Sequence, residues 1–148
     1  MIHVVNLSAL SFALLLMGCN AGGSGSGAPG DGDDTQPYSE IGIKEVLHFT
    51  GTEPFWGGQV AGDTLTYTTP ENGDGWPIRV SRFAGRNGVS FTGSLEGQDF
   101  VLAVTPGACN DGMSDRTYPF HVTLKVTGET RTGCAWSDEH PFTSLAKP

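Results

Sequence analysis

The chain has 148 residues and a formal net charge of −8, with 8 basic against 16 acidic side chains. This balance argues against nucleic acid as a partner and against docking on anionic lipid through basic side chains, because both interactions need clustered Lys and Arg. The part of the chain that follows the first 37 residues is long enough for one hydrophobic core and too short for two.

The chain begins with an uncharged apolar run, Leu7 to Met17. The run fits the apolar region of a secretory signal and is shorter than the ~20 residues that span a bilayer. It ends in Leu16-Met17-Gly18-Cys19, which resembles the lipobox of bacterial lipoproteins. The resemblance implies that residues 1–18 are a lipoprotein signal peptide, cut before Cys19, and that the Cys19 thiol is lipidated. The residues before the run lack the Lys or Arg that such signals usually carry.

A lipid on Cys19 would anchor the mature chain to a membrane. Each buried methylene contributes ~0.8 kcal/mol, so several acyl chains on one cysteine bind stably without a transmembrane helix. Asn20, at the second mature position, resembles the pattern sent to the outer membrane in bacteria with two membranes. We therefore expect a lipoprotein on the periplasmic side of the outer membrane. Residues 19–37 are rich in Gly, Ser and Asp, which predicts a flexible linker before a domain at 38–148.

The domain alternates apolar and polar residues with the period of β-strands. In the segment Tyr118 to Val126 every even position is apolar, as expected of a half-buried strand. Pairs such as Asn87-Gly88 and Glu96-Gly97 favour the tight turns of hairpins. Shorter strands are predicted at Val46–Thr50, Thr64–Thr68, Ile78–Phe83, Val89–Gly93, Asp99–Val104 and Thr130–Trp136, with a turn at Glu71–Gly75.

These elements predict an all-β fold. About seven or eight short strands joined by tight turns favour an antiparallel meander, and closing the meander into a barrel removes exposed edges. A two-sheet sandwich is the alternative. Apart from Cys19, the cysteines are Cys109 and Cys134, which we expect to form a disulfide in an oxidising periplasm. A redox or metal role is the weaker alternative, because the pair lacks Cys-x-x-Cys spacing and an adjacent histidine.

Three motifs occur in order along the domain: Gly51-Thr52-Glu53-Pro54-Phe55-Trp56, then Cys109-Asn110-Asp111-Gly112-Met113-Ser114-Asp115-Arg116-Thr117-Tyr118-Pro119-Phe120, then Gly133-Cys134-Ala135. Together they resemble a family of bacterial envelope lipoproteins and predicted membrane proteins. The resemblance implies a small antiparallel β structure and assigns no activity, since that family has no settled function.

A looser likeness connects the domain to the membrane-bound inhibitors of c-type lysozyme. These are lipoproteins with compact β-barrels and a disulfide, and a loop with a serine ahead of a tyrosine approaches the lysozyme cleft. Ser114, Arg116 and Tyr118 are the counterparts that this chain offers. The likeness implies a lysozyme-inhibitor-like envelope protein as an alternative function.

The densest polar cluster of the domain lies in the same loop. Asp111, Ser114, Asp115, Arg116 and Tyr118 could form a binding surface held in place by the disulfide. The same residue types also build turns: Asp111 could accept hydrogen bonds from backbone amides, and Arg116 could pair with Asp115 or Asp111. Both interpretations stay open at this point.

The motif that contains Glu53 and Trp56 is a second candidate for binding. Trp56 could stack on a ligand, although an aromatic residue that plugs the barrel is the simpler interpretation. Glu53 could accept hydrogen bonds or pair with an arginine.

Catalysis is not expected. Ser114, His121 and an aspartate could be combined into a hydrolase site, but no Gly-x-Ser-x-Gly elbow is present. The histidines lack metal-ligand spacing, so neither a metal nor another cofactor is predicted. The sequence therefore predicts a tethered, non-catalytic β domain, with an envelope protein or a glycan as its ligand or with a purely structural role.

Overall fold

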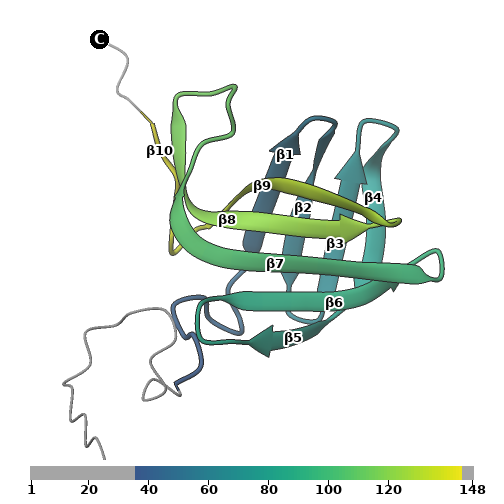
Figure 1. The fold of residues 1–148 in the computed structure, drawn as a ribbon, viewed down its shortest axis with the longest axis horizontal. Helices are drawn as coiled ribbons and strands as arrows, with labels where there is room; N and C mark the ends of the chain where they lie inside the picture. The colour runs from purple at the N-terminus through teal and green to yellow at the C-terminus, as the bar shows by residue number, and fades with distance from the viewer. Residues whose placement is uncertain (1–35, 145–148) are drawn as a thin grey trace, which may run out of the picture. The chain divides into compact units, whose positions relative to one another are not determined.

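The computed structural model describes residues 36–144, which form strands and no helix. The signal peptide, Cys19 and most of the linker lie outside the described residues. Nothing in residues 36–144 is a helix long and apolar enough to cross a membrane. The strands (Figure 1) are β1 (Leu47–Thr52), β2 (Phe55–Ala61), β3 (Thr64–Thr69), β4 (Asn72–Arg79), β5 (Ser81–Ala84), β6 (Val89–Leu95), β7 (Gln98–Cys109), β8 (Arg116–Val126), β9 (Glu129–Ser137) and β10 (Thr143–Ser144).

The strands form one antiparallel meander that nearly closes into a barrel. The sheet order is β4-β3-β2-β1-β9-β8-β7-β6-β5, and β10 pairs with β8. The two ends of this order, β4 and β5, are consecutive in the chain and join at Val80, so one bent segment pairs with β3 and then with β6. Figure 1 shows β1–β4 crossing the direction of β6–β9. The predicted all-β meander is thereby confirmed in its near-barrel form.

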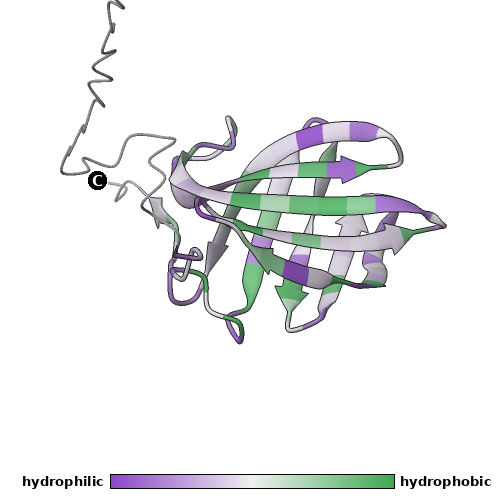
Figure 2. Cartoon of the chain, turned by 60° about the horizontal axis from the view of Figure 1, so that its bottom comes forward, coloured by the Kyte–Doolittle hydropathy of each residue, from purple (hydrophilic) through white to green (hydrophobic). Residues whose placement is uncertain are grey.

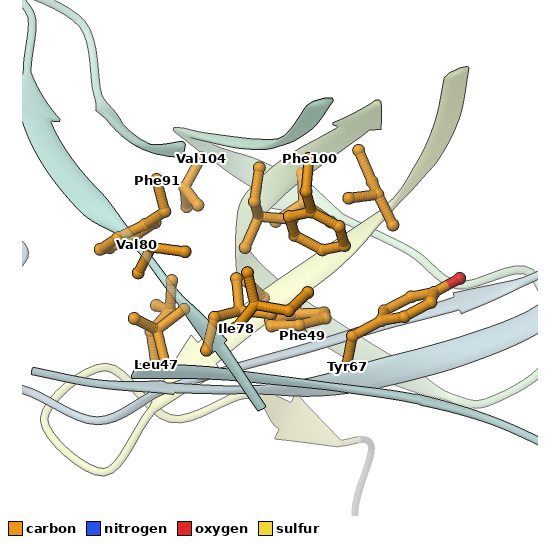
Figure 3. Close-up of a cluster of buried hydrophobic side chains, with 14 of the residues drawn as sticks. Leu47, Phe49, Tyr67, Ile78, Val80, Phe91, Phe100 and Val104 are labelled. Carbon is orange, nitrogen blue, oxygen red and sulfur yellow. The ribbon is translucent and has the colours of Figure 1, made fainter. Parts of the chain in front are cut away.

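The barrel interior is filled by inward-facing residues of β1–β9, with β5 contributing the partly buried Ala84 and β10 contributing none. In β8, buried Phe120, Val122, Leu124 and Val126 alternate with exposed or half-buried residues, as the sequence pattern predicts. Apolar bands recur along the strands in Figure 2, and Figure 3 shows the side chains that meet inside. Burying one such side chain contributes about 1.5–3 kcal/mol. The labelled members of this core are Leu47, Phe49, Tyr67, Ile78, Val80, Phe91, Phe100 and Val104.

Strand β2 was not predicted from the sequence. Its Gly57-Gly58 pair carries no side chains, so the segment shows no alternation. Gly58 has a φ of 150°, and a Cβ atom there would lie 1.9 Å from the carbonyl oxygen of Thr66. Glycine is therefore required for the backbones of β2 and β3 to pair at this point.

The turn predicted at Glu71–Gly75 is wrong in its position. The chain turns at Pro70 and Glu71, and β4 already begins at Asn72, which pairs with Thr69. Residues 72–75 carry an irregularity of the sheet: the Asn72 side chain accepts a hydrogen bond from the Gly75 amide at 3.1 Å, and Gly75 has a φ of 81°. Turn-forming residues therefore mark a bulge beside the turn, which sequence patterns do not distinguish from the turn itself.

The predicted disulfide between Cys109 and Cys134 is present, with a Cα–Cα distance of 5.6 Å. It joins the end of β7 to β9 across a sequence separation of 25 residues. A loop of this length gives a stabilisation of about 3–4 kcal/mol in the chain-entropy account. A second apolar cluster surrounds the bond and contains Tyr118, Trp136 and Phe142. Phe142 leads into β10, a short strand that was not predicted.

Candidate functional site

The disulfide loop, residues 109–118, is organised around the carboxylate of Asp111. One oxygen accepts hydrogen bonds from the amides of Met113 and Ser114, at 3.0 and 2.8 Å. The other accepts from the hydroxyls of Ser114 and Tyr118, at 2.8 and 3.0 Å. The two amide bonds are the largest effects, and together with the hydroxyl bonds they outweigh the desolvation by burial and hold the pKa of Asp111 well below its ordinary value. These contacts favour the turn-building interpretation of Asp111, Ser114 and Tyr118.

Arg116 and Asp115 are placed differently from that cluster. The Arg116 guanidinium lies over the ring of Phe142, 4.3 Å from its centroid, and forms a cation–π contact in place of the predicted ion pair. Asp115 is exposed beside it. The loop also bonds to the barrel, because the Thr52 hydroxyl donates to the Asp111 carbonyl at 3.3 Å. The loop is therefore a packed turn on the outside of the barrel, and its exposed side chains are Asn110, Met113, Asp115, Arg116 and Thr117.

The residues proposed for a hydrolase do not assemble around the serine. Asp111 and His121 line the same hollow of about 200 Å³ beside the disulfide, and Ser114 is not among its lining residues. The Ser114 hydroxyl donates to Asp111, and in the part of the chain that the structure describes it contacts no histidine that would activate it as a nucleophile.

The other motif divides between the core and the surface. Trp56 is only 4% exposed and packs against Phe49, with ring centroids 5.9 Å apart. It lies over Gly51, where a Cβ atom would come within 2.2 Å of the indole. Trp56 thus fills the barrel interior. Glu53 is exposed in the β1–β2 turn, and the neighbouring Phe55 is 54% exposed.

Phe55 lines a cavity that the sequence did not indicate. Four hairpin turns (β1–β2, β3–β4, β6–β7 and β8–β9) meet at one end of the barrel around a cavity of about 320 Å³. We call this cavity the barrel mouth. Its volume lies at the lower end of the range for small-molecule sites. The aromatic and charged side chains that line it are those of Phe55, Tyr67, Glu71, Trp76, Glu96 and Arg131.

Arg131 lies at the floor of the barrel mouth. It is opposite the buried Leu124 in the β8–β9 register, so it takes an inward-facing position, and its side chain is 19% exposed. Its Nη1 donates to the Tyr67 hydroxyl at 2.9 Å, while Nη2 and Nε donate to Glu129 at 2.8 and 3.2 Å. A guanidinium has five N–H groups, and these contacts use three of them. The hydrogen bonds found among the described residues therefore leave two N–H groups of the Arg131 guanidinium, which lines the mouth, without a protein acceptor.

Tyr67 connects the barrel mouth to the core. Its ring packs edge-on against Phe100 and stacks on Trp76, with centroids 5.4 and 5.8 Å apart. In Figure 3 its hydroxyl points away from the cluster of buried side chains. Desolvation by burial, the largest effect, raises the pKa of this hydroxyl, so it remains a neutral donor and acceptor at neutral pH.

A third polar cluster lies at the opposite end of the barrel. The buried Glu45 carboxylate accepts hydrogen bonds from the Ser137 hydroxyl and from the Gly42 amide, and contacts His140 Nδ1 at 2.9 Å. Burial alone raises the pKa of Glu45, but these hydrogen bonds together outweigh it and lower the pKa below its ordinary value. Ser137 is 0% exposed, so no substrate reaches its hydroxyl. The cluster fastens the segment before β1 to the end of β9.

The barrel mouth was missed because no local pattern marks it. Arg131 lies in Thr130-Arg131-Thr132, where either face of the strand could point inward. The register with Leu124 fixes the face, and that register depends on the folded sheet.

Comparisons of the chain with protein-family models, curated proteins and solved structures find no match.

Proposed function

We propose that this chain is a lipid-anchored protein of the outer membrane that presents a non-catalytic ligand-binding barrel to the periplasm. The lipobox-like Leu16-Met17-Gly18-Cys19 and the Gly-rich linker support the anchor. The single observation that supports binding is the preformed barrel mouth, in which Arg131, Tyr67 and Trp76 are held in place before any ligand arrives. A site that is already ordered loses less conformational entropy when it binds.

The hydrogen bonds of two serine hydroxyl groups, those of Ser114 and Ser137, support the non-catalytic part of the proposal. The Ser114 hydroxyl donates to Asp111, and the buried Ser137 hydroxyl donates to Glu45. Within residues 36–144 neither hydroxyl donates to a histidine, the most frequent general base for a serine nucleophile. The inhibitor-like alternative requires Ser114 and Tyr118 to contact a partner, whereas both donate to Asp111.

The anchor and the binding site need separate tests. Labelled palmitate should enter the wild-type chain, and Cys19→Ala should abolish both the labelling and the cleavage before residue 19. A mature chain that carries no label would contradict the anchor.

For binding, the purified mature protein should be dialysed in detergent against the small-molecule fraction of an envelope extract, and the retained compounds identified by mass spectrometry. We expect compounds that wild type retains and Arg131→Gln does not. Arg79→Gln is the matched control, because Arg79 is an exposed arginine paired with Asp63 away from the mouth. Equal retention by all three proteins, or none by wild type, would contradict the proposed site.

A further inference from the structure

The ligand class of the barrel mouth follows first from its charges. Arg131 is the cation that lines the described cavity, and its charge is compensated by Glu129 at 2.8 Å. Glu71 and Glu96 add two carboxylates to the lining. Hydrogen bonds from the backbone amide of Glu71 and from Thr69 lower the pKa of Glu71, so that carboxylate is ionised at neutral pH. The acidic groups outnumber the single cation, and phosphate or carboxylate ligands are therefore disfavoured.

The carboxylates alone would attract a simple cation, and the positive charge of Arg131 opposes this. The guanidinium of Arg131 lies at the floor of the mouth, where a bound ammonium group would face it in a partly desolvated space. The hydrogen-bonding groups are mixed: Arg131 offers donors, Glu71 and Glu96 offer acceptors, and Tyr67 offers both. A ligand that satisfies such a set has many hydroxyl groups, because a hydroxyl both donates and accepts.

Aromatic and apolar surface completes the lining. Trp76 is half-buried and backed by Tyr67, and Phe55 is 54% exposed at the rim. The face of an aromatic ring carries partial negative charge, which attracts the weakly positive C–H groups on the face of a sugar ring. Pro54 and Pro70 add rigid apolar walls from two turns. A cavity of about 320 Å³ accommodates one or two such rings.

From these features we infer that the barrel mouth binds an uncharged sugar, such as the terminal residue of an envelope glycan. The ring stacks on Trp76 and Phe55, while its hydroxyl groups bond to Arg131, Tyr67 and the rim carboxylates. This inference rests on the proposed function and specifies the ligand of the same site.

The test uses the indole N–H signals of the three tryptophans in the ¹⁵N-labelled mature protein in detergent. N-acetylglucosamine and glucose are the sugar probes, and acetate and tetramethylammonium are the charged probes. We expect a sugar to shift the Trp76 signal saturably, with a Kd of about 1 mM, while the buried Trp56 and the distant Trp136 stay unchanged. Phe55→Ala should weaken this binding about tenfold. Phe83→Ala should leave it unchanged, because Phe83 is 68% exposed and lies outside the mouth.

The other outcomes distinguish failure of the sugar inference from failure of the proposed binding site. A saturable Trp76 shift with acetate or tetramethylammonium alone would overturn the sugar inference and leave the proposed binding site intact. If no probe shifts Trp76, the sugar inference also fails, and the dialysis experiment decides the proposed function independently. Equal weakening by Phe55→Ala and Phe83→Ala would show that the shift does not report binding in the mouth and would overturn the inference.

Discussion

The disulfide loop and the barrel mouth are both rich in polar and aromatic side chains, and they use them in opposite ways. In the loop, the Asp111 carboxylate accepts four hydrogen bonds from the loop's own groups, and Arg116 covers the ring of Phe142. In the mouth, Arg131 keeps two donors beside a cavity of about 320 Å³. A dense polar motif in a sequence therefore indicates a self-satisfied turn as readily as a site, and the distinction lies in which polar groups remain available.

The largest expected effect concerns the bond that holds the loop. Replacing both cysteines, Cys109→Ser with Cys134→Ser, should lower the free energy of unfolding by about 3–4 kcal/mol, because the unfolded chain regains the freedom that the bond removed. Urea unfolding of the variant and of oxidised and reduced wild type measures the change. If the loop has only a structural role, ligand retention by the folded variant should match that of wild type. An unchanged unfolding midpoint would contradict the stabilising role.

Asp111→Ala should have the next largest effect. It removes the acceptor of four hydrogen bonds in the loop, so we expect a loss of about 1–3 kcal/mol. Arg116→Ala is the comparison within the loop and should cost about 0.5–1 kcal/mol, because its cation–π contact is exposed. Thermal melts of both variants measure the difference. Unchanged melts together with loss of an envelope ligand would instead make the loop a recognition surface.

Stability should also fall in acid, and the loop should account for part of the loss. The pKa values of Asp111 and Glu45 are lowered in the folded protein, so each carboxylate binds protons more readily in the unfolded chain. Their contributions are complete above the ordinary values of 3.8 and 4.5, and decline as the pH falls toward the lowered pKa values of the folded state. Urea midpoints between neutral and acidic pH should fall less steeply for Asp111→Ala than for wild type. Parallel curves would contradict this role of Asp111.

The smallest effect on stability is expected in the mouth. Phe55→Ala removes a side chain that is 54% exposed, and it should change the free energy of unfolding by no more than about 0.5 kcal/mol. Phe83→Ala should change it equally little, and only Phe55→Ala should impair ligand retention. A large drop in the melting temperature of Phe55→Ala would place Phe55 among the residues that hold the barrel together.

Much of the fold was predictable because local patterns determine it. The alternation in β8 and the turns at Asn87-Gly88 and Glu96-Gly97 are properties of neighbouring residues. The disulfide was predicted from the expected oxidising compartment and from the two cysteines that remain besides Cys19. Strand β2 was not predictable, since Gly58 is selected by its contact with Thr66 on another strand.

The candidate site was less predictable than the fold. Arg131 meets Tyr67 across a sequence separation of 64 residues, and Glu45 meets Ser137 across 92. Such contacts depend on sheet closure and register, which no window of sequence contains. The Asp111 loop attracted attention because its polar residues are adjacent in sequence, and that proximity is also what lets them satisfy one another.

Hydrogen exchange of the purified protein, with and without the small-molecule fraction that the proposed site is expected to retain, tests the contrast between the disulfide loop and the barrel mouth most directly. We predict slower amide exchange in the two turns that border Arg131 and Glu96, at residues 95–98 and 126–131. Exchange in the disulfide loop, residues 109–118, should not change. Protection of the loop without protection of these turns would contradict the assignment of the barrel mouth as the binding site.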